Sequence, residues 1–88
     1  MKASDLKKLL NQDVSTTEKV KSVTIDDRNK EHPTRSVRHT DVVIVYGTSN
    51  DIVKLYFQDN QLYSIDGYVN VYRLKTMKEL VEMMLEQQ

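Results

Sequence analysis

The sequence predicts an α+β fold: an N-terminal helix, an antiparallel meander sheet of four to five strands, and a C-terminal helix packed on the sheet. The length of 88 residues suits a single domain, residues 1–88. The middle of the chain alternates β-branched and aromatic runs with short polar turns, whereas both ends carry leucine or methionine at helical spacing. Helices laid on an antiparallel sheet would bury both patterns in one core.

The N-terminal helix is expected over residues 5–12. Ser4 suits the N-cap position, and Leu6, Leu9 and Leu10 follow at the spacing of one helical face.

The segment after this helix fits two structures. Ser15 and Glu18 have the spacing of a capping box, which would begin a second helix. Several β-branched residues favour a strand instead, and we expect one over residues 20–25. Residues 26–36, which hold the only proline, then form a polar surface loop.

Two hairpins are expected next, from strands over residues 37–47, over residues 51–57 and from Gln61 onward. Their loops are interpreted as three residues long, Thr48–Asn50 and Gln58–Asn60. Each ends in an asparagine, which tolerates the left-handed conformation that such loops require.

Loop length determines which side chains share a face of the sheet. With three-residue loops, Val45 faces Val53 and Leu55 faces Tyr63, so odd-numbered residues lie together. This odd face is aliphatic, as a buried face should be: Val37, Val43, Val45, Val53, Leu55, Phe57, Tyr63 and Ile65. The even face is apolar but edged with phenols and one lysine: Val42, Ile44, Tyr46, Ile52, Lys54, Tyr56 and Leu62. Either the N-terminal helix or another protein chain would cover the even face.

The last part of the sheet and the C-terminal helix follow. Asp66-Gly67 is interpreted as a turn before a final strand over residues 68–74, with a bulge in one long strand as the alternative. Thr76 and Glu79 form a capping box that would begin the helix. The apolar stripe of this helix has the spacing i, i+3, i+4, i+7, i+8: Met77, Leu80, Val81, Met84 and Leu85.

Composition narrows the classes of function. Thirteen basic and thirteen acidic residues give no net charge, which argues against a dedicated nucleic-acid binder and against an acidic DNA mimic. The chain has no cysteine, so disulfides and cysteine-ligated zinc are excluded and a cytoplasmic location is favoured. The longest apolar run, residues 42–46, is too short to span a membrane.

Two groups of residues are candidates for chemistry. His39 and Asp41 share a strand face, as in a general-base pair, but no nucleophile motif accompanies them. Asp27, Asn29 and Glu31 alternate as an EF-hand loop begins, yet the required glycine and final glutamate are missing. We therefore expect no catalytic residues, no metal site and no cofactor.

The resulting hypothesis is a non-enzymatic protein-binding or regulatory module that self-associates as a homodimer. It would be of the inhibitor or immunity type that phages and mobile elements encode, an expectation that rests on small size alone. The expected partner-binding residues are Ile44, Tyr46, Lys54, Tyr56, Tyr68 and Tyr72. The alternative is a nucleic-acid-binding accessory protein that uses the basic loop over residues 28–39. Its contact residues would be Arg28, Lys30, Arg35 and Arg38.

Overall fold

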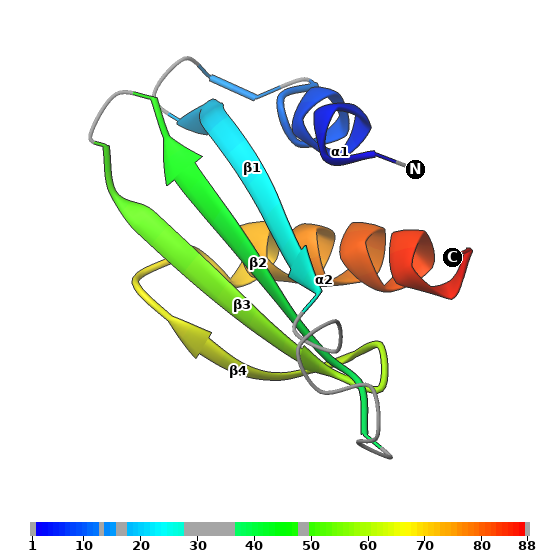
Figure 1. Ribbon diagram of the computed structural model, residues 1–88. Helices are drawn as coiled ribbons and strands as arrows, with labels where there is room; N and C mark the ends of the chain where they lie inside the picture. Colours follow the sequence, from blue (N-terminus) through cyan, green and yellow to red (C-terminus); the bar gives the residue numbers. More distant parts are fainter. Residues whose placement is uncertain (1, 13, 16–17, 28–36, 48–49, 88) are drawn as a thin grey trace.

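The computed structural model describes residues 2–12, 14–15, 18–27, 37–47 and 50–87 (Figure 1). The elements, in chain order, are α1 (Ala3–Leu10), β1 (Val20–Asp27), β2 (His39–Tyr46), β3 (Ile52–Gln58), β4 (Gln61–Asp66) and α2 (Val71–Glu86). The four strands form one antiparallel sheet in the order β1-β2-β3-β4. The predicted α+β fold, with a helix at each end of a meander, is confirmed.

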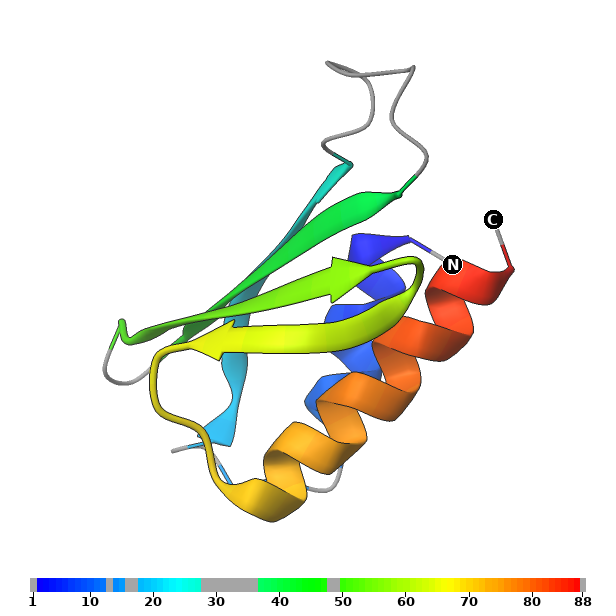
Figure 2. The same ribbon diagram turned by 90° about the horizontal axis from the view of Figure 1, so that it is seen from below.

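Both helices lie on the same side of the sheet, as Figures 1 and 2 show. Apolar residues of the helices and of all the central strands meet there in one core. The fully buried members are Leu6, Leu10, Val42, Ile44, Val53, Leu55, Phe57, Met77, Val81 and Met84. Within the described part of the chain, the opposite side of the sheet therefore has no helical cover.

The helices begin earlier than the sequence predicted. In α1, the Asp5 carboxylate accepts a hydrogen bond from the Lys2 backbone N–H at 3.0 Å, so Lys2 rather than Ser4 is the N-cap. Residues 68–74 were expected as a strand, but α2 starts at Val71. Asn70 caps this helix, since its side-chain oxygen accepts from the Tyr72 N–H at 2.9 Å.

The apolar stripe of α2 is confirmed, because Met77, Val81, Met84 and Leu85 are buried and Leu80 packs against them. The strand expected over residues 20–25 is also confirmed, as β1, which continues to Asp27.

The first hairpin loop is one residue longer than predicted. Ile44 pairs with Val53 across the β2–β3 ladder, where the sequence pattern placed Val45 opposite Val53. The loop thus begins at Gly47 and ends at Asn50, which has the expected left-handed conformation, with φ of 57°. The predicted register and face assignment of this hairpin are therefore wrong.

The second hairpin loop is one residue shorter than predicted. Gln58 pairs with Gln61 around a two-residue turn, Asp59-Asn60, with φ of 50° and 67°. Positive φ at both central residues is the type I′ geometry, which matches the twist of paired strands. A bulge then adds Tyr63 to β4.

Gly67 ends β4 and turns the chain toward α2, instead of forming a hairpin or a bulge. Its φ is +112°, and a Cβ atom on this residue would lie 2.6 Å from the carbonyl oxygen of Ile52. Only glycine meets both conditions without strain.

Side chains bind backbone groups at both edges of the sheet. At β1, the Asn11 amide pairs with both backbone groups of Val20: it donates to the carbonyl at 3.0 Å and accepts from the N–H at 2.6 Å. At β4, the Glu82 carboxylate of α2 accepts from the Leu62 N–H at 3.4 Å.

Candidate protein-binding surface

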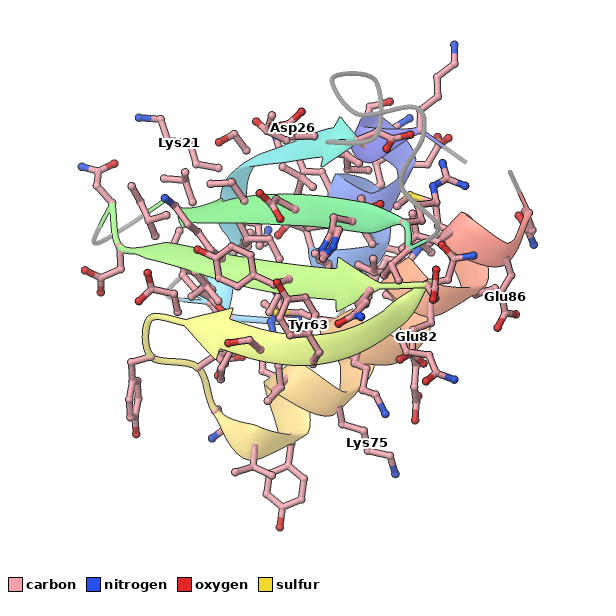
Figure 3. All side chains as sticks on the ribbon, turned by 60° about the horizontal axis from the view of Figure 1, so that its bottom comes forward. Lys21, Asp26, Tyr63, Lys75, Glu82 and Glu86 are labelled. Atoms are coloured by element: carbon pink, nitrogen blue, oxygen red, sulfur yellow. The ribbon has the colours of Figure 1, made fainter. Side chains whose placement is uncertain are left out.

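We call the side of the sheet that faces away from α1 and α2 the open face; Figure 3 looks onto it. The observed register sets odd residues of β2 beside even residues of β3 on this side. Its apolar centre comes from three strands: Val43, Val45, Ile52, Tyr56 and Tyr63. Ile52 and Tyr63 are 52% and 53% exposed, a large fraction for side chains of this kind.

An aromatic cluster lies at one end of the open face. The bulge in β4 places the Tyr63 ring 6.3 Å from that of Tyr56, at an interplanar angle of 47°. The His39 ring contacts Tyr63 edge-on from the other side, also with a centroid distance of 6.3 Å and an angle of 79°. Three rings from three strands thus form a continuous, partly exposed surface.

The charged residues of the open face are mainly acidic. Lys54 on β3 lies directly opposite Asp66 on β4, and Asp26 on β1 lies opposite Asp41 on β2. In these described cross-strand pairs, three carboxylates stand against one ammonium, a negative balance at neutral pH. A basic partner surface would therefore be attracted to it.

The open face is large enough for specific association. Four strands of about seven residues, about 4.8 Å apart and rising about 3.4 Å per residue, cover a flat footprint of roughly 450 Å². The accessible area of a corrugated sheet exceeds its footprint, and a standard interface buries about 800 Å² per partner. The open face alone supplies most of that area.

The partner-binding residues predicted from the sequence are divided among four places. Lys54 and Tyr56 lie on the open face, as expected of a contact surface. Ile44 is fully buried in the core on the opposite side. This placement corrects its assignment to an exposed face, and the four-residue loop is the reason.

The other three predicted residues lie near the start of α2. Tyr46 is half-buried, packs against the core and lines a pocket of about 250 Å³ together with Tyr68 and Arg73. Tyr68 and Tyr72 are 91% and 83% exposed, but they lie on the β4–α2 connection and the first turn of α2. They are not part of the open face.

The alternative nucleic-acid contacts fall mostly outside the described residues. Arg28, Lys30 and Arg35 belong to the segment 28–36, which the structure does not describe. Arg38 is described, and its guanidinium pairs with the Asp27 carboxylate at 3.0 Å. Nucleic-acid binding through this loop stays a prediction.

His39 and Asp41 are the pair for which the sequence suggested general-base chemistry. Both side chains lie on the open face two residues apart, and His39 packs against Tyr63. Among the described residues, no group of three or more potential ligands is arranged to hold a metal ion. No described helix is both long and apolar enough to cross a membrane.

Sequence reasoning missed Val43, Val45 and Tyr63, which it placed on the buried face. The available signals were Gly47, which suits the start of a loop, and Asp59-Asn60, which suits a two-residue type I′ turn.

No protein-family model, no curated protein and no solved structure matches this chain. The geometry of its own residues is therefore the basis for the functional proposal.

Proposed function

We propose that this protein is a non-enzymatic protein-binding module whose open face binds another protein. The observation that supports this most is the placement of both helices on one side of the sheet, with Tyr56, Tyr63 and Ile52 on the other. Aromatic residues with an apolar body and a polar tip are enriched at protein interfaces.

The charge balance indicates the kind of partner. The partner presents an apolar patch whose border carries lysine or arginine, because Asp26, Asp41 and Asp66 outnumber Lys54. A second copy of the same face fits less well, since two net-negative faces repel each other. A regulatory action of the inhibitor or immunity type, in which the module occupies a surface of its target, is consistent with such a contact.

The test compares matched tyrosine variants in affinity capture from a host extract, followed by calorimetry with the captured protein. Tyr56→Ala, on the open face, should weaken the contact at least tenfold, because central aromatic residues dominate interface energetics. Tyr72→Ala is the control, since this tyrosine is 83% exposed but lies off the open face. Circular dichroism establishes that both variants are folded.

Two results would contradict the proposal. One is that the wild-type protein and Tyr56→Ala capture the same proteins with equal affinity. The other is that Tyr72→Ala loses the partner while Tyr56→Ala retains it, which would move the contact to the start of α2.

A further inference from the structure

One flank of α2 carries a charged stripe that the core and the open face do not use. Lys75, Lys78, Glu82 and Glu86 recur at i, i+3, i+7 and i+11, which places them on one side of the helix. The hydrogen bond from the Leu62 N–H to Glu82 sets this stripe beside β4, at the edge of the sheet. Figure 3 shows Lys75, Glu82 and Glu86 along the same side of α2.

The order of charges along the stripe is the reverse of what stabilises an isolated helix. Lysines occupy the first half and glutamates the second, whereas the helix dipole favours acids at the start and bases at the end. Lys78 also precedes Glu82 by four residues, the less favourable orientation, and their 3.9 Å contact is long. Within the described part of the chain, Lys75 and Glu86 form no ion pair. Helix stability alone therefore does not account for this pattern.

A helix that is basic in its first half and acidic in its second is complementary to itself when reversed. We propose that a second copy of this protein docks along this flank, with the two α2 helices antiparallel about a two-fold axis that crosses the stripe at the level of Leu80 along the helix. Lys78 then lies opposite the partner's Glu82, and Lys75 lies opposite the partner's Glu86. The helix registers that these two pairings require differ by only one residue, or about 1.5 Å along the helix axis.

The surroundings of the stripe support a close approach of this kind. Next to its basic half, a shallow apolar pocket of about 230 Å³ lies between β4 and α2, lined by Leu62, Ile65 and Leu74 among others. Ile65 is 40% exposed there. This contact leaves the open faces of both copies accessible, so the dimer and the proposed partner site are independent of each other.

The experiment is sedimentation equilibrium of the full chain over a range of concentrations in about 50 mM and about 500 mM salt. The wild-type protein should form a weak dimer at low salt that dissociates at least fivefold more readily at high salt. Lys75→Glu and Glu86→Lys should each raise the dissociation constant at least tenfold, because each places like charges together twice across the axis. The double variant Lys75→Glu/Glu86→Lys should restore the dimer, since the reversed charges are again complementary.

Lys21→Glu is the matched control, because Lys21 is an exposed lysine on β1, far from the stripe (Figure 3). It changes the net charge by the same amount and should leave the dissociation constant unchanged. A wild-type chain that remains monomeric at millimolar concentration overturns the proposal. A dimer that ignores both single reversals, or that the double variant fails to restore, overturns it equally.

Discussion

Replacing two neighbouring valines of β2 by alanine tests the register on which the open face depends. Val42 is fully buried beneath the helices, whereas Val43 points to the open face and is half-buried. The chemical change and the strand are the same in both variants, so the loss of β-propensity is common to both. Any difference in stability reports the side of the sheet on which each residue lies.

The expected magnitudes follow from burial. Val42→Ala removes two carbon atoms from the core at about 0.8 kcal/mol each. A residual cavity of about 50 Å³ adds roughly 1.2 kcal/mol at about 24 cal/mol per Å³. The total loss in the free energy of unfolding is about 3 kcal/mol. Val43→Ala loses about half of the burial free energy of the two carbon atoms and leaves no closed cavity. Its loss in the free energy of unfolding is therefore about 1 kcal/mol.

Thermal unfolding followed by circular dichroism measures the difference. At roughly 5 °C per kcal/mol for a domain of this size, Tm should fall by about 15 °C for Val42→Ala and about 5 °C for Val43→Ala. The three-residue loop inferred from the sequence predicts the opposite order. Equal losses, or a larger loss for Val43→Ala, would refute the register and with it the composition of the open face.

Two further substitutions test the turns that set this architecture, each by urea denaturation. Gly67→Ala should lower the free energy of unfolding by about 3 kcal/mol, because alanine would be strained at a φ of +112° and its Cβ would collide with the Ile52 carbonyl. A loss below about 1 kcal/mol would show that this turn relaxes freely. Asn60→Gly should raise the free energy of unfolding by about 0.5–1 kcal/mol, since glycine is preferred in the second position of a type I′ turn and the buried Asn60 Oδ1 has no hydrogen-bond partner among the described residues. A destabilised variant would contradict this account of the hairpin.

The helical stripe of α2 was predictable because it depends only on spacing within one element. Met77, Val81 and Met84 recur at 3.6-residue periodicity whatever the rest of the chain does. The start of the same helix was not predictable in this way. Val71 and Tyr72 favour a strand locally, and it is the Asn70 cap together with the turn at Gly67 that commits them to the helix.

The face assignment failed because it depends on loop lengths rather than on the strands themselves. The four observed strands were located to within about two residues, yet one additional loop residue, Gly47, was enough to reverse the sides of β2 relative to β3. Both sides of this hairpin are rich in apolar residues, so hydrophobicity alone did not discriminate between the two registers. Of the candidate site, Lys54 and Tyr56 were found from sequence, whereas Tyr63 required knowledge of the bulge.

The side chains that bind the sheet edges have a consequence for how this protein assembles. An exposed apolar layer next to unpaired strand backbone is the usual starting point of fibril growth. Here Asn11 occupies both polar groups of Val20, while Glu82 and the bulge interrupt β4. At these positions another chain would meet side chains rather than open backbone, which disfavours the addition of further strands there.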